Sequence, residues 1–291
     1  MHQFLSAVGF HDVTKREDID ALIREVIQYP TDQAQWIKED GTRVVELSRE
    51  FGEYMGIAVR GEYNLSGEFE AEYYFPYFCG KSITTAEHVD IEKHSDREAY
   101  AGVCDDPRIG ITLIFYLQNA LEYFTEYYKG SLRGSMQTAL TGLVRRGMIL
   151  LPVVKEEKKN KTGRNSGADR LSLIQKAKDG DEEAIESLTL EDIDTYSMLS
   201  RRIEHEDVLT IVNTYFMPYG IESDQYAVLG EILDYHYTRN VKTGEDICIM
   251  TLNCNSLVFD VCVNEQDLVG EPQIGRRFKG VIWMQGAITH M

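Results

Sequence analysis

The closing stretch of the chain, residues 226–291, most constrains the fold, because short β-type runs alternate there with glycine turns. Aromatic and β-branched residues are enriched in four runs, at 226–237, 247–252, 257–263 and 278–288. Strands this short, joined by turns, are typical of an antiparallel meander or a small curled barrel. The sequence therefore predicts a small C-terminal β module, compatible with an OB-like or SH3-like barrel that an upstream strand or helix could complete.

Upstream, the periodicity predicts helices first and an antiparallel sheet after them. Residues 18–29 carry apolar side chains at the spacing of one buried helix face, and a second helix is predicted over 42–54. From residue 57 the pattern changes to alternation, and the predicted strands occupy 57–63, 68–75, 88–94, 109–121, 138–143 and 148–154. The strand over 109–121 could run into a helix near 120–128. The last two strands, 138–143 and 148–154, are expected to pair with each other around Arg145-Arg146-Gly147.

These patterns predict an α+β fold in two domains, which a chain of 291 residues can accommodate. The first domain, residues 1–155, holds the N-terminal helices and the antiparallel sheet. Residues 156–169 are strongly polar and are predicted to be a linker or mobile loop. The second domain, residues 170–291, combines a helical segment with the C-terminal β module.

Charge and cysteine content narrow the classes of function. The formal net charge of −18 repels phosphate backbones and anionic lipid, so nucleic acid is disfavoured as a partner. The five cysteines form no C-x-x-C motif and are predicted to be free thiols in a reducing compartment. No signal-peptide pattern and no membrane-spanning apolar run occurs, which predicts a cytoplasmic protein without membrane association.

The most distinctive cluster of candidate binding residues comprises Arg276, Arg277, Lys279 and Trp283. Cations interleaved with aromatic rings can contact phosphates and stack on bases, which is how many single-strand binders work. In the competing interpretation, Trp283 is a core residue and the two arginines pair with acidic side chains of the helical segment 181–207. Acidic residues outnumber basic ones across 218–291, which favours this structural interpretation.

Three functions are compatible with the sequence. The preferred hypothesis is a non-enzymatic binding or scaffold protein that acts through a protein partner or through self-association as a homodimer. Its working surface would lie on the β module or in the cleft between domains, and exposed strand edges would favour pairing. The first alternative is a single-stranded nucleic-acid-binding module that uses the 276–283 cluster. The second is a metal-dependent hydrolase that uses His88, His94 or one of the carboxylate pairs, Asp105 with Asp106 or Asp192 with Asp194. No motif predicts a catalytic residue, a metal site or a cofactor.

Several strings together resemble a family of bacterial proteins of unknown function from Gram-positive anaerobes. They are Met1-His2-Gln3-Phe4-Leu5 and the sequences at 178–186, 216–220 and 270–286. The resemblance extends over the whole chain. It implies a cytosolic bacterial protein without an assigned activity, so it adds no functional residue.

Overall fold

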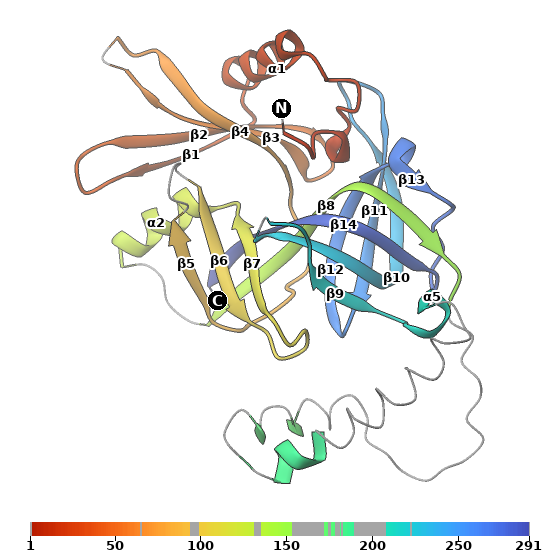
Figure 1. Ribbon diagram of the computed structural model, residues 1–291. Coiled ribbons are helices and arrows are strands. Elements are labelled where there is room, and N and C mark those ends of the chain that lie inside the picture. Colours follow the sequence, from red (N-terminus) through yellow and green to blue (C-terminus); the bar gives the residue numbers. More distant parts are fainter. Residues whose placement is uncertain are drawn as a thin grey trace.

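Strands account for most of the chain and form two sheets (Figure 1). The computed structural model describes residues 2–64, 66–93, 99–130, 135–152, 172–173, 176–177, 181, 183–188, 208–221 and 223–290. The strands are β1 (Asp32–Ile37), β2 (Arg43–Gly52), β3 (Met55–Tyr63), β4 (Phe69–Phe78), β5 (Val89–Lys93), β6 (Tyr100–Asp105), β7 (Thr112–Leu117), β8 (Met136–Leu150), β9 (Tyr215–Pro218), β10 (Gln225–Arg239), β11 (Asp246–Cys254), β12 (Leu257–Asn264), β13 (Leu268–Val269) and β14 (Arg277–His290). The labelled helices are α1 (Arg16–Gln28), α2 (Ala120–Tyr128) and α5 (Val208–Ile211), with short 3-10 turns η1 (Ser6–Val8) and η2 (Glu265–Asp267).

The smaller sheet is an antiparallel meander in the order β1-β2-β3-β4. Helix α1, predicted over 18–29 from its periodicity, turns its buried residues Ile19, Leu22 and Val26 inward and packs against β2 and β3. Each strand is joined to the next by a short turn, so neighbours in sequence are neighbours in space. The result is a sheet whose second face is left free to form one wall of a cleft.

The larger sheet closes on itself into a five-stranded barrel in the order β8-β12-β11-β10-β14-β8. Strand β8 closes the ring, because one of its edges pairs antiparallel with β14 and the other pairs parallel with β12. Apolar side chains such as Met250, Val261, Phe278 and Ile282 are fully buried in one core cluster. The barrel is therefore completed by a strand that lies more than a hundred residues before its last strand.

Strand β14 continues past the barrel and joins it to the remaining strands. Its residues Gln285 and Gly286 pair in parallel with Tyr116 and Leu117 of β7, which continues through β6 to β5. In Figure 1 these three strands and α2 lie beside the barrel and beneath the smaller sheet. The end of β14 thus lies where the smaller sheet, α2 and the barrel meet.

The predicted α+β class is wrong, because strands dominate and the chain does not place helices before a sheet. The segment 42–54, predicted as a helix, is β2 and its turn into β3. Its apolar residues Val44, Val45, Leu47 and Phe51 satisfy both periods, and pairing with β1 and β3 selects the strand. The strand pair predicted over 138–154 is one continuous strand, β8.

The two predicted domain ranges share one sheet. Strand β8, from range 1–155, lies between β12 and β14, from range 170–291. The predicted linker 156–169 lies outside the described residues, as does most of the predicted helical segment after it.

Asn240 anchors the N-terminal 3-10 turn to the barrel. Its fully buried side chain donates to the carbonyl oxygen of Val8 at 2.8 Å and accepts from the backbone N–H groups of Lys242 and Thr243. We expect Asn240→Ala to lower the free energy of unfolding by about 1–3 kcal/mol, because buried polar groups lose their partners. Urea denaturation measures this change. Val241→Ala in the same turn, where the side chain is 81% exposed, is the control and should change stability by less than about 0.5 kcal/mol; equal effects would contradict the assigned role.

Candidate functional site: an acidic cleft beside the barrel

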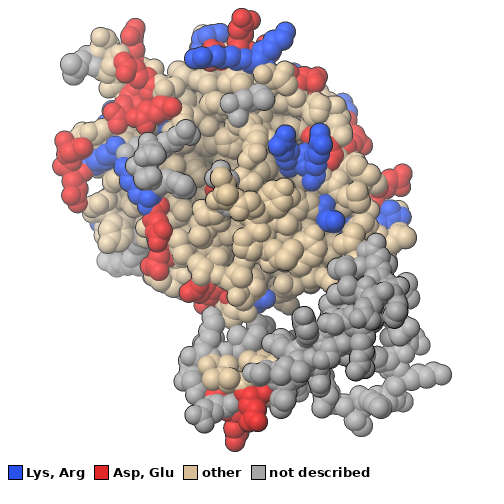
Figure 2. Space-filling view, viewed as in Figure 1, with Lys and Arg blue, Asp and Glu red and all other residues tan. Residues whose placement is uncertain are grey.

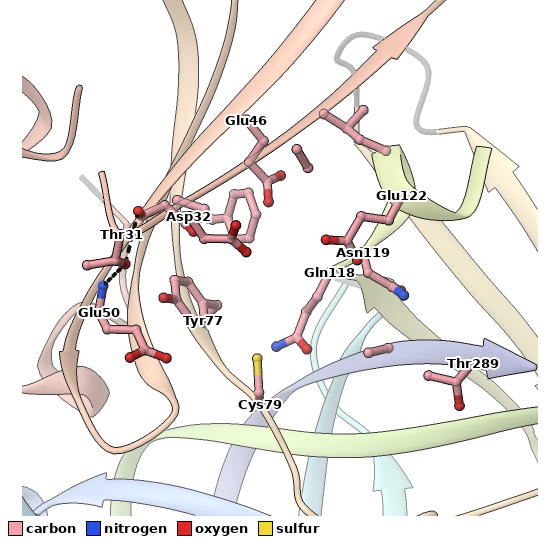
Figure 3. Close-up of a pocket in the computed structure, with 16 residues that line it drawn as sticks. Thr31, Asp32, Glu46, Glu50, Tyr77, Cys79, Gln118, Asn119, Glu122 and Thr289 are labelled. Carbon is pink, nitrogen blue, oxygen red and sulfur yellow. Dashed lines mark hydrogen bonds between the residues drawn. The ribbon is translucent and has the colours of Figure 1, made fainter. Parts of the chain in front are cut away.

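A cleft of about 490 Å³ lies between the smaller sheet and the junction of α2 with β14 (Figure 3). One wall comes from β1, β2, β3 and β4, and the other from Gln118, the start of α2 and the end of β14. Strand register explains the first wall, because Asp32 pairs with Ser48 and Ala34 pairs with Glu46 across β1 and β2. Alternate residues of a strand face the same side, so Glu46, Ser48 and Glu50 all face the cleft.

Four carboxylates surround this cleft: Asp32, Glu46, Glu50 and Glu122. Figure 3 shows them on both walls, Asp32, Glu46 and Glu50 on the sheet side and Glu122 on α2. No Lys, Arg or His occurs among the described residues that line the cleft. Burial, followed by the negative charges of Asp32, Glu46 and Glu126, raises the pKa of Glu122. Burial and, to a smaller extent, the neighbouring carboxylates therefore oppose ionisation of Glu122.

Within the described ranges, Glu46 is the one carboxylate of the four with a cationic partner, the fully buried guanidinium of Arg60. Arg60 also donates to the hydroxyl of Tyr73 at 2.8 Å and to the carbonyl oxygen of Gln118 at 3.2 Å. Burial by itself would lower the pKa of Arg60, but Glu46 and the nearby tyrosines raise it, so the side chain stays charged. In the described part of the chain, no cation lies within ion-pair distance of Asp32, Glu50 or Glu122.

The floor of the cleft presents one unused acceptor, the side-chain oxygen of Gln118. Both N–H groups of this amide are used, donating to the carbonyl oxygen of Phe78 at 2.9 Å and to Oε1 of Gln285 at 2.7 Å. Gln285 in turn donates to the carbonyl oxygen of Pro76, so the network fixes the orientation of both amides. Gln118 is only 8% exposed, and no described residue donates to its Oε1, which lines the cleft.

Cys79 also lies on this floor, and it is the only half-buried thiol of the five free cysteines, all of which are described. Burial, with smaller contributions from Glu50, Glu122 and Glu46, raises the pKa of Cys79 to about 11. The thiol is therefore protonated at neutral pH, which disfavours a nucleophilic role. It is a neutral lining group that a bound molecule would cover.

The structure separates the residues of the predicted basic and aromatic cluster. Arg277 is 4% exposed and donates to the carbonyl oxygens of Leu151 and Val212, while Trp283 is 6% exposed and donates from Nε1 to Asp224 at 2.7 Å. Arg276 donates to the carbonyl oxygen of Glu271, and Lys279 lies on the outer face of the barrel. The four side chains therefore form no single surface.

Of the two histidines of the hydrolase alternative, the structure describes only His88. The His88 side chain is 77% exposed and lies 3.3 Å from Asp90, and His94 lies outside the described residues. Across the described ranges, no group of three or more His, Cys, Asp and Glu side chains is arranged to hold a metal ion. None of the described helices is long and apolar enough to cross a membrane.

The sequence interpretation did not select Glu46, Glu50, Gln118 or Glu122 as site residues. Glu46, Ser48 and Glu50 alternate along the chain, which in a strand places all three on one face. The prediction of a helix over this segment prevented that inference. Gln118 and Glu122 carry no local signal, because their role depends on contacts with β4 and β14.

Comparison with known proteins agrees with the resemblance drawn from the sequence strings. A family model described as "Domain of unknown function, E. rectale Gene description (DUF3881)" matches residues 5–286. No curated protein and no solved structure matches the chain. The matched range includes the smaller sheet and the larger sheet up to Gly286 of β14. It also includes every residue that lines the cleft except Ala287 and Thr289 of β14. The chain belongs to the DUF3881 family.

Proposed function

We propose that this protein is a non-enzymatic binding protein whose cleft holds a lysine or arginine side chain of a protein partner. The observation that carries the proposal is the lining of the cleft, where three carboxylates and the side-chain oxygen of Gln118 have no cation or donor as partner among the described residues. Ammonium and guanidinium groups are hydrogen-bond donors only, and these lining groups are acceptors. The complementarity is therefore one of charge and of hydrogen bonding.

The remaining walls suit the apolar stem of such a side chain. Phe75, Ala58 and Tyr77 contribute buried apolar surface to the cleft behind the carboxylates. Long cationic side chains pack their methylene groups on apolar surface and keep the charged end beside polar groups. Burial, followed by the neighbouring negative charges, raises the pKa of Glu122, and an incoming cation would offset those charges.

Peptide binding tests the proposal. We expect isothermal titration calorimetry at low salt to show binding of a tri-arginine or tri-lysine peptide, and Glu50→Gln/Glu122→Gln to weaken it at least tenfold. Two charge-assisted hydrogen bonds contribute about 1.5–3 kcal/mol each, and about 1.4 kcal/mol is a factor of ten. Glu68→Gln/Glu72→Gln, which removes two exposed carboxylates near and on β4 outside the cleft, is the matched control.

Three results would contradict the proposal: no binding of either peptide, equal weakening by the two double variants, or binding of free spermidine tighter than that of both peptides. The first would exclude a cationic ligand. Equal weakening by the two double variants would mean that the peptide binds through the general negative charge of the surface. Preference for spermidine would mean that the ligand is a small polyamine and not a protein partner.

The affinity for the peptide should rise with pH. Because the pKa of Glu122 is raised, part of its population is protonated at mildly acidic pH, and a cation binds the ionised form better. Binding should therefore strengthen as pH rises through this raised pKa. The free energy of unfolding of the unliganded protein should fall over the same range, because the folded state favours the protonated form of Glu122. Glu122→Gln should flatten the pH profile of peptide affinity in calorimetry, and an unchanged profile would contradict the role of Glu122.

A further inference from the structure

A second, separate concavity of about 740 Å³ lies on the outer face of the barrel. Strands β8, β14, β10 and β9 contribute to its lining, and η2, β13 and His11 border it. It shares no lining residue with the acidic cleft. Volumes of this size are typical of small-molecule sites, which range over about 300–1,000 Å³.

Two cations lie in this groove, Arg146 on β8 and Lys279 on β14, and neither has a carboxylate partner among the residues that the structure describes. The register pairs Lys279 with Met148 and Arg146 with Val281, so the two cations are diagonal neighbours on one face of the sheet. Diagonal neighbours lie about 7–8 Å apart, a spacing at which two long side chains can contact one phosphate group. Within the described ranges, no carboxylate is within ion-pair distance of either cation.

The one acidic residue in the lining is already engaged. Asp267 accepts a hydrogen bond from the hydroxyl of Ser6, and its carboxylate lies 3.8 Å from Nε2 of His11. On the face of the molecule seen in Figure 2, acidic side chains gather over the smaller sheet. The chain has a formal charge of −18, so two cations without a described carboxylate partner in one groove are a local exception to its overall negative charge.

Aromatic rings lie across the groove from these cations. Tyr215 and Tyr219 line it, and the Tyr219 side chain is 49% exposed. Leu229 of β10 pairs with Lys279 on one side and with Tyr215 on the other, so Tyr215 lies two strand spacings, about 10 Å, from Lys279. Aromatic side chains beside a cationic site provide stacking surfaces for a planar ring attached to a phosphate.

We infer that this groove binds a nucleoside phosphate, with its phosphates between Arg146 and Lys279 and its base against Tyr215 and Tyr219. Arginine and lysine both form charge-assisted hydrogen bonds to phosphate oxygens. Stacking on tyrosine does not require a particular base, so the groove would recognise nucleoside phosphates as a class rather than one base. The inference is independent of the proposed function of the acidic cleft.

Fluorescence anisotropy of N-methylanthraniloyl-ADP with the full chain tests this inference. We expect binding at low salt, displacement by unlabelled ADP, weaker displacement by adenosine or by inorganic phosphate alone, and a loss of affinity of at least about tenfold in Arg146→Ala/Lys279→Ala. Tyr219→Ala should weaken displacement by ADP while leaving that by inorganic phosphate unchanged. Thermal unfolding of these variants should match the wild type, because the replaced side chains lie at the surface.

The matched control is Lys15→Ala/Arg24→Ala, which removes two exposed cations from the region of α1 and should leave ADP affinity unchanged. Glu50→Gln/Glu122→Gln should also leave it unchanged, which separates this site from the acidic cleft. Equal losses in the two cation variants, or failure of ADP to displace the probe, would overturn the inference. Displacement by an oligothymidylate strand at much lower concentration than by ADP would replace the free nucleotide with a single strand as the ligand.

Discussion

Replacement of Arg60 by alanine is expected to lower the free energy of unfolding by about 3–5 kcal/mol, because it leaves a partly buried carboxylate without its partner. The guanidinium is fully buried, forms an ion pair with Glu46 and donates to Tyr73 and Gln118. It also lies over the rings of Phe75 and Tyr116, at 5.4 and 5.9 Å from their centroids. All of these contacts disappear together.

Chemical denaturation measures this loss, and Arg145→Ala is the control. Arg145 is exposed on β8, so its replacement should change stability by less than about 0.5 kcal/mol. The double replacement Arg60→Met/Glu46→Leu should recover part of the loss, since an apolar pair leaves no unpaired charge. A cost for Arg60→Ala no larger than that of the control would contradict the stabilising role of this ion pair between β2 and β3.

Replacement of Phe278 by alanine should cost about 3–5 kcal/mol, because the cavity forms inside the closed barrel. The ring is fully buried and packs against glycines of the paired strands β8 and β14. A Cβ atom placed on Gly147 would lie 2.4 Å from this ring, and one placed on Gly280 would lie 2.6 Å from it. The two glycines therefore make the space that Phe278 fills.

A double-mutant cycle tests this packing directly. Gly147→Ala should destabilise the wild-type protein by about 1–3 kcal/mol through overpacking, and the same change should cost much less in the Phe278→Ala background. Denaturation curves of the four proteins give the coupling energy. Additive effects would show that the ring and the glycine do not share one space, and would count against closure of the barrel by β8.

Local patterns in the sequence predicted several elements correctly. The β-branched and aromatic runs at 247–252 and 257–263 became β11 and β12, and the apolar stripe of 18–29 became α1. The helix predicted over 42–54 was wrong because the two valines, the leucine and the phenylalanine of this segment fit the helical and the strand period equally well. The sequence predicted a turn between two strands at Arg145-Arg146-Gly147. The structure instead has a register irregularity opposite Val281 and Ile282, and β8 continues through it as one strand.

The sequence did not indicate which strands pair when they lie far apart along the chain. Barrel closure depends on β8 pairing with β12 and β14, and no local signal identifies such partners. The cleft has the same origin, since Gln118 and Gln285 are separated by 167 positions and meet only after the smaller sheet and β14 come together. Long-range contacts can also remove a surface that the sequence predicts. Arg277 and Trp283 belong to the predicted binding cluster, but their hydrogen bonds to Val212 and Asp224 hold both side chains in the interior.

Protection of Cys79 tests most directly whether the acidic cleft holds a cationic side chain. Cys79 lines the cleft floor, and the other four cysteines are buried, so they serve as an internal reference. Modification by N-ethylmaleimide is carried out at alkaline pH, where a larger fraction of the Cys79 thiol is ionised, and is followed by mass spectrometry. A tri-arginine peptide should slow modification of Cys79 in the wild type and have little effect in Glu50→Gln/Glu122→Gln. Modification of wild-type Cys79 at the same rate with and without saturating peptide would contradict the account.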